Sequence, residues 1–231
     1  MIIELYPAFE EVFFDETLKG IFYPLCSVTL TNEAETKLHF VSSNGIWTND
    51  EGTSQYNSSQ YIAFDVIESK YAFYGNIELY NGHKEAKEIF PIMETDFNEN
   101  GKRYLDAKLK TKDYLNEIKK IIPQVADENL DLNYYLKTFF EFSINKLNAQ
   151  LNRGFGQFQR IIDGYEKPEK SPIVYSDSKT LHQTDVPAID NIETFKAIGM
   201  TIGSEFFTDG NDTVLFYNDA EQKVLCVNSY S

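Results

Sequence analysis

The residues closest to a metal-binding pattern are Asp96-Phe97-Asn98-Glu99-Asn100-Gly101. Oxygen-bearing side chains at positions 1, 3 and 5, with glycine at position 6, are typical of the start of a calcium loop. The acid expected at position 12 is absent, because Ala107 stands there and Asp106 comes one place early. The candidate ligands are thus Asp96, Asn98, Asn100 and Asp106, but an Asn-Gly turn between two strands explains the same residues without a metal.

Histidine and cysteine spacing does not indicate a zinc site. No two of His39, His83 and His182 are closer than 44 residues, whereas zinc motifs bring two ligands at close spacing. We expect His39 to be a structural histidine within a strand, which leaves His182, in a polar loop, as the histidine to test. Cys26 and Cys226 lie in apolar runs. A disulfide is one interpretation, and two buried thiols in a reducing cytoplasm is the simpler one.

Catalytic motifs are incomplete. Glu94 and Asp96 would share one face of a predicted strand and form an acid/base pair, although carboxylates on an edge strand are more often solvated. The Gly-x-Gly at 154–156 follows a predicted helix and lacks the third glycine of a nucleotide loop, and no Gly-x-Ser-x-Gly motif occurs. We expect no cofactor. A hydrolase that uses acidic residues, with or without a metal ion, stays an alternative function.

Tyrosines cluster in the first half of the chain and are candidates for binding. Tyr71, Tyr74 and Tyr80, with Glu68 and Glu78, would bind a sugar or a basic peptide, the peptide through cation–π contacts. Core packing and cross-strand pairing explain most of these rings equally well. The sequence therefore leaves both interpretations open.

The first hundred residues favour strands. Predicted strands cover 22–30 and 37–42, joined through 31–35, and then 60–67 and 71–80, where residues alternate between two faces. Turn residues predict a loop at 43–59. A hairpin is predicted from 92–97 and 103–109 around the Asn98–Gly101 turn.

The rest of the chain switches to helices and then returns to strands. The first predicted helix begins at an N-cap, Thr111, and ends before Pro123. The second runs from about Asp131 to Asn152, with Gly154 as the capping glycine. Residues 164–189 predict a loop with a short strand at 172–175, followed by a short helix at 191–198. A three-stranded meander is predicted at 201–207, 213–217 and 223–228, with turns at 209–210 and 218–219.

Acidic residues concentrate at the two ends of the chain. Residues 1–100 carry 17 acids and 5 bases, a net charge of −12; residues 101–200 have a net charge of +1 and residues 201–231 one of −4. This distribution argues against nucleic-acid binding, which needs clustered Lys and Arg. It would steer a basic partner into contact, and solubility alone is the simpler explanation. No apolar run approaches the ~20 residues of a membrane span, so we expect no membrane partner and a cytoplasmic location.

Strands, then helices, then strands predict an α+β protein with an antiparallel β-rich N-terminal half, central helices and a C-terminal antiparallel meander. We expect residues 1–231 to form a single domain with two lobes, about 1–110 and 111–231. The closing meander and the acidic, motif-free character resemble bacterial immunity proteins, which neutralise toxins; no residue motif carries this resemblance. It implies a non-enzymatic protein-binding module for a basic partner, and a structural or assembly component of a phage or secretion system is a further alternative.

Overall fold

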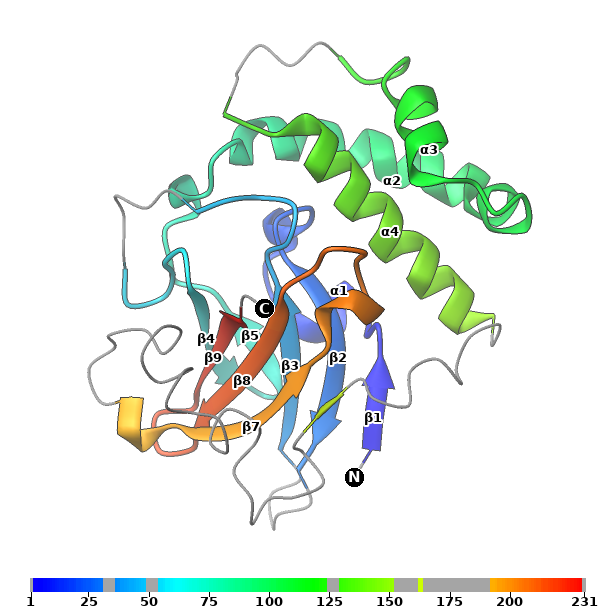
Figure 1. Cartoon of the computed structure of the whole chain (residues 1–231). Coiled ribbons are helices and arrows are strands. Elements are labelled where there is room, and N and C mark those ends of the chain that lie inside the picture. Colours follow the sequence, from blue (N-terminus) through cyan, green and yellow to red (C-terminus); the bar gives the residue numbers. More distant parts are fainter. Residues whose placement is uncertain are drawn as a thin grey trace.

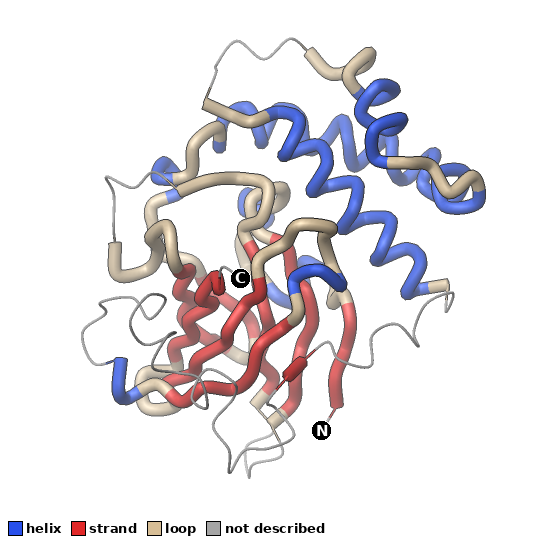
Figure 2. The backbone as a smooth tube through the Cα atoms, in the orientation of Figure 1, coloured by secondary structure: helices blue, strands red, loops and turns tan. Residues whose placement is uncertain are grey.

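The computed structural model of the chain describes residues 2–30, 36–48, 54–123, 129–151, 162–163 and 192–229. These residues form two antiparallel sheets and a group of helices (Figures 1 and 2). N-terminal strands, central helices and C-terminal strands in this order confirm the predicted α+β class. No helix in the described ranges is long and apolar enough to span a membrane.

The first sheet is made by the N-terminal part of the chain. Its order is β1-β2-β3, with strands β1 (Ile2–Leu5), β2 (Tyr23–Thr29) and β3 (Lys37–Ser42). Both pairs are antiparallel, and the register places Cys26 between Leu5 and Phe40. The predicted neighbouring strands at 22–30 and 37–42 are confirmed. Helix α1 (Phe9–Val12) and the 3₁₀ turn η1 (Glu16–Leu18) connect β1 to β2.

The second sheet joins the two ends of the chain. Its order is β5-β4-β9-β8-β7-β6, with strands β4 (Tyr61–Ile67), β5 (Lys70–Ala72), β6 (Ile162–Asp163), β7 (Lys196–Thr201), β8 (Asp212–Asn218) and β9 (Lys223–Ser229). Strand β9 pairs with β4 on one side and β8 on the other. Hydrogen bonds therefore cross the boundary expected near residue 110, and the division into two lobes stays a proposal.

Both faces of the central strands of this sheet, β4, β9 and β8, are buried, which explains their almost continuous apolar sequence. Alternate residues of β4, such as Ile62 and Phe64, point into the main core, and the residues between them, such as Tyr61 and Ala63, pack in a smaller cluster on the other face. Period-two alternation in a strand produces this division. Phe195, just before β7, belongs to the smaller cluster.

Three helices pack together on one side of the sheets (Figure 1). They are α2 (His83–Asp106), α3 (Thr111–Ile118) and α4 (Leu132–Gln150). The predicted helix at about 131–152 is confirmed by α4. The Asp131 side chain caps it by accepting a hydrogen bond from the Tyr134 N–H at 3.1 Å. Its buried stripe includes Tyr135, Phe139 and Phe140, so α4 is the central helix of this layer.

The predicted hairpin around Asn98–Gly101 is wrong, since all of 92–106 lies within α2. Ile89, Met93 and Tyr104 are buried on this helix, and their spacing places them along one helical face. Packing of this face against α4 outweighs the local turn preference of Asn-Gly. Gly101 stays helical with the Phe97 ring directly over it, where an added Cβ would come within 2.7 Å of that ring.

Other element boundaries also differ from the prediction. The strand at 71–80 is limited to β5, after which the chain turns through the 3₁₀ segment η2 (Ile77–Leu79). The helix expected at 191–198 is reduced to η4 (Ile192–Thr194), and the first meander strand is β7, not 201–207, where η5 (Gly203–Glu205) lies. The N-cap of α3 is Lys110, not Thr111. Gly154 and the predictions for 164–189 lie outside the described residues.

Candidate binding sites

The predicted calcium ligands lie around a helix instead of in a loop. Asp96, Asn98, Asn100 and Asp106 are all in α2, where only residues three or four apart share a face. Asp96 is already hydrogen-bonded: it accepts from the Tyr104 hydroxyl at 2.9 Å and from the Asn100 amide at 3.1 Å. Within the described residues no group of three or more His, Cys, Asp or Glu could hold a metal ion. These four residues therefore do not form the loop that the calcium pattern predicts, and the hydrolase alternative stays a prediction.

The predicted acid/base pair lies on different faces of a helix, and the predicted structural histidine is hydrogen-bonded in the core. Glu94 and Asp96 do not share a face, because α2 is a helix. His39 is fully buried: its Nδ1 lies 2.7 Å from the Ser27 hydroxyl and its Nε2 lies 2.8 Å from the Ser69 carbonyl oxygen. Burial lowers the pKa of His39 to about 4. The expectation of a structural histidine is confirmed, and His182 lies outside the described residues.

The predicted binding residues are divided between core and surface. Tyr71 and Tyr80 are 0% exposed, and the Tyr71 hydroxyl donates to the His39 carbonyl oxygen at 2.8 Å. Neither ring is accessible to a partner. Glu68, Tyr74 and Glu78 are exposed, and their role in binding stays a prediction.

Glu68 belongs to a surface that gathers carboxylates around two exposed apolar side chains. Glu68 and Ser69 connect β4 to β5 with φ values of 50° and 65°, the backbone of a two-residue type I′ turn. Ile67 is 43% exposed and is paired with Lys70 across this hairpin. The Lys70 ammonium lies 5.6 Å from the centre of the Phe14 ring, which is 51% exposed. Phe14, Lys70 and Ile67 are therefore neighbours on one surface.

Acidic residues from both ends of the chain border these two apolar side chains. Asp15 and Glu16 follow Phe14 directly, and both are exposed. The turn between β8 and β9 carries exposed Asp219 and Glu221, and its Gln222 carbonyl oxygen accepts from the Val66 N–H at 2.7 Å. We call this surface the acidic patch; it consists of five carboxylates and one lysine around the two apolar side chains: Phe14, Asp15, Glu16, Ile67, Glu68, Lys70, Asp219 and Glu221.

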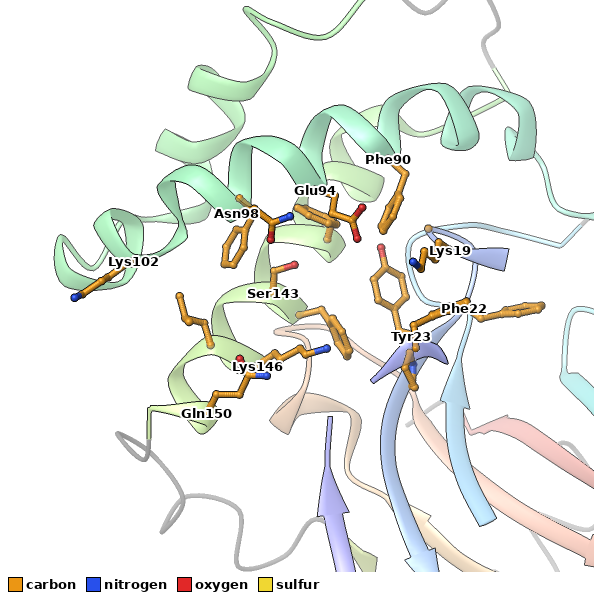
Figure 3. A pocket seen from close by; sticks show the side chains of 17 residues that line it. Lys19, Phe22, Tyr23, Phe90, Glu94, Asn98, Lys102, Ser143, Lys146 and Gln150 are labelled. Atoms are coloured by element: carbon orange, nitrogen blue, oxygen red, sulfur yellow. The ribbon is translucent and has the colours of Figure 1, made fainter. Parts of the chain in front are cut away.

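A cavity of about 360 Å³ lies between the η1–β2 segment and helices α2 and α4 (Figure 3). Six phenylalanines give it an apolar wall: Phe9, Phe22, Phe90, Phe97, Phe139 and Phe142. On α2 the lining residues Phe90, Glu94, Asn98 and Lys102 are spaced by four, so they form one stripe along the helix. On α4 the cavity is lined by residues from 139 to 150.

A glycine lets the η1–β2 segment close one side of this cavity. Gly20 has a φ of +79°, and a Cβ there would come within 2.6 Å of the Tyr135 hydroxyl and 2.8 Å of the Phe90 ring. The Tyr135 hydroxyl donates to the Gly20 carbonyl oxygen at 3.0 Å. Close approach of this backbone to both helices positions Lys19 and Tyr23 at the cavity.

Two polar groups at the cavity lack a close partner among the described residues. The buried Tyr23 hydroxyl has no hydrogen-bond partner there, and burial raises the pKa of Tyr23 far above its usual value. Lys146 is partly buried, which lowers its pKa, although three carboxylates of the surroundings oppose this effect: Glu10, Glu94 and Glu11. None of the described carboxylates forms an ion pair with Lys146 within 4.0 Å. In Figure 3 the Lys146 side chain extends into the cavity and the Tyr23 hydroxyl points toward the α2 wall.

No protein family, curated protein or solved structure matches this chain. The cavity and the acidic patch therefore have to be interpreted from their own chemistry.

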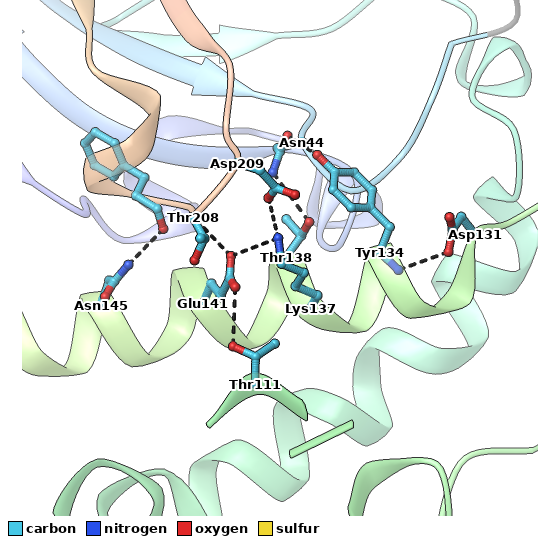
Figure 4. A network of polar contacts seen from close by, with 11 residues as sticks. Asn44, Thr111, Asp131, Tyr134, Lys137, Thr138, Glu141, Asn145, Thr208 and Asp209 are labelled. Carbon is cyan, nitrogen blue, oxygen red and sulfur yellow. Dashed lines mark hydrogen bonds and ion pairs between the residues drawn. The ribbon is translucent and has the colours of Figure 1, made fainter. Parts of the chain in front are cut away.

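Glu141 on α4 is a buried acid whose contacts connect three parts of the fold (Figure 4). Glu141 is 6% exposed and accepts from the Thr208 N–H at 2.9 Å and from the Thr111 hydroxyl at 3.3 Å. It also pairs with Lys137 at 3.6 Å, and Lys137 pairs in turn with Asp209. These contacts fasten α3 and the η5–β8 segment to α4.

Of the cavity residues, only Glu94 and Asn98 are candidates from the sequence, and each is a candidate for a different role there. The lining of the cavity comes from segments up to about 140 residues apart in the chain, from Phe9 to Gln150, and the α2 stripe was hidden by the wrong hairpin. One signal was available: apolar residues at 86, 89, 93, 97 and 104 recur at helical spacing.

Proposed function

We propose that this chain is a non-enzymatic protein-binding module that binds a basic partner through the acidic patch. An immunity-type role, in which the partner is a basic toxin, is the specific form of this proposal. The observation that carries it is the combination, on one surface, of two exposed apolar side chains and five exposed carboxylates.

This arrangement fits what protein interfaces require. A few apolar or aromatic anchors at the centre supply most of the binding energy, and the surrounding charged groups select the partner and speed the encounter. Phe14 and Ile67 would be the anchors. The carboxylates around them favour a partner whose own anchors are surrounded by Lys or Arg.

Charge reversal tests the proposal. We would compare wild-type protein, the patch variant Glu68→Lys/Glu221→Lys and the control variant Glu88→Lys/Glu99→Lys, which changes the net charge equally at exposed positions of α2. The wild-type and control proteins should capture the same basic protein from source cells, and the patch variant should not. Equal capture by both double variants would contradict the role of the patch.

Salt and anchor dependence complete the test once the captured protein is purified. The Kd should rise with ionic strength, because at 0.1 M salt the attraction between exposed charges more than about 10 Å apart is largely screened. The Phe14→Ala change should raise the Kd about tenfold or more, the effect of losing a binding anchor. An affinity that depends neither on salt nor on Phe14 would refute the proposal.

A further inference from the structure

The cavity between α2, α4 and the η1–β2 segment has a chemistry of its own, separate from the acidic patch. Its wall of phenylalanine rings is apolar, and its charged lining residues are three lysines, Lys19, Lys102 and Lys146, and one carboxylate, Glu94. Lys19 is paired with Glu16 at 3.9 Å, and Glu10 and Glu11 also act on Lys146. A volume of about 360 Å³ is at the lower end of the range for small-molecule sites. An apolar body with a compact anionic head group fits this combination.

Two groups at the cavity would gain from such a head group. The Tyr23 hydroxyl is buried without a partner in the described residues, and an unpaired buried hydroxyl costs about 1–3 kcal/mol. The Lys146 ammonium is partly buried and lacks an ion pair with any described carboxylate. An anion beside Lys146 would pair with the ammonium, and one that also reached the Tyr23 hydroxyl would accept a hydrogen bond from it.

We propose that this cavity binds a small carboxylate with an apolar, preferably aromatic, body, with Lys146 and Tyr23 holding the carboxylate and the phenylalanine rings enclosing the rest. The rings provide edge-to-face contacts for an aromatic guest, as they already do for one another: Phe90 and Phe139 meet at 5.7 Å and 87°. Glu94 at the same wall disfavours ligands with further negative charge. This proposal does not depend on the acidic patch.

A series of probes with one body and three head groups tests it. Calorimetric titration would use 4-phenylbutyrate, 4-phenylbutanol and 4-phenylbutylamine on the full chain. The carboxylate should bind at least tenfold more tightly than the alcohol, and the amine should bind most weakly. Equal affinity for the three probes would overturn the proposal, because it would mean that only the apolar wall contributes. Absence of phenylbutyrate binding at millimolar concentration would overturn it as well.

Three single variants assign the head-group contacts. Lys146→Met keeps the apolar stem and removes the charge, so the affinity for phenylbutyrate should fall tenfold or more while that for phenylbutanol stays unchanged. Tyr23→Phe removes a hydroxyl that has no described partner, so it should weaken phenylbutyrate binding several-fold without lowering the melting temperature. Lys84→Met, at an exposed position at the start of α2, is the control and should bind as wild type does. Unchanged phenylbutyrate affinity in both cavity variants would overturn the assignment.

Discussion

The charge state of His39 should make the stability of this protein depend on pH in a measurable way. His39 is 0% exposed, and the contact of its Nε2 with the Ser69 carbonyl oxygen at 2.8 Å requires that Nε2 carries a proton. In the neutral ring Nδ1 then accepts from the Ser27 hydroxyl. A second proton on Nδ1 would remove this acceptor and place a charge in the core.

The sign and size of the effect follow from the lowered pKa. Burial takes the pKa of His39 from 6.5 to about 4, so protons bind more readily to the unfolded chain. The neutral histidine therefore does not reduce stability above pH 6.5, and stability is lost as the pH falls from 6.5 toward 4. The difference corresponds to about 3 kcal/mol in full, of which about 2 kcal/mol is lost between pH 7 and pH 5.

Urea unfolding of wild-type protein and of the His39→Gln variant at pH 7, 6 and 5 measures this contribution. Gln supplies an amide donor for the Ser69 carbonyl oxygen but does not titrate. Carboxylates titrate in both proteins, so the difference between their pH profiles isolates His39. Wild type should lose about 2 kcal/mol more than the variant between pH 7 and pH 5. Parallel profiles, or a His39 imidazole that titrates near 6.5 by NMR, would refute the reasoning.

The aromatic cluster around α3 gives two further predictions, both measured by chemical denaturation at neutral pH. Tyr114→Phe removes a buried hydroxyl without a described partner, so it should leave the free energy of unfolding equal or raise it by up to about 1 kcal/mol. Tyr104→Phe breaks the hydrogen bond to Asp96 and should lower the free energy of unfolding by about 1 kcal/mol. The reverse order would contradict this hydrogen-bond pattern. Phe140 is stacked on Tyr114 with ring centres 4.2 Å apart, so Phe140→Ala should cost about 3–5 kcal/mol. A cost below about 1 kcal/mol would mean that this stack is not part of the core.

The parts of the fold that were predictable from sequence are those where local pattern and tertiary packing agree. The strand at Lys37–Ser42 was predicted at its observed bounds, and the strand at Tyr61–Ile67 within one residue. The helix α4 combines a capping Asp131 with a long apolar stripe. In each of these segments the periodicity and the end signals indicate the same element.

Errors arose where local signals opposed packing. In α2 the Asn-Gly pair favours a turn, but contacts of the helix with α4, which no local pattern reveals, decide the outcome. The segment at 71–80 alternates as a strand would, yet Tyr80 reaches the core from a 3₁₀ turn. The cavity cannot be found without α2, since one of its walls is α2 and the other is α4. Reasoning from single elements therefore could not find it.

Glu68 in the acidic patch presents a different case, because its backbone conformation is unfavourable for a glutamate. Glu68 has a φ of 50°, a conformation that glycine or asparagine adopts easily and that costs most other residues about 1–2 kcal/mol. Local backbone strain therefore opposes Glu at this position. Asn-Gly would form the same turn more favourably. The turn itself does not require this side chain. Under the proposed function its role is a contact with the partner, so Glu68→Asn should stabilise the chain and weaken capture of the partner, and an unchanged capture would contradict that role.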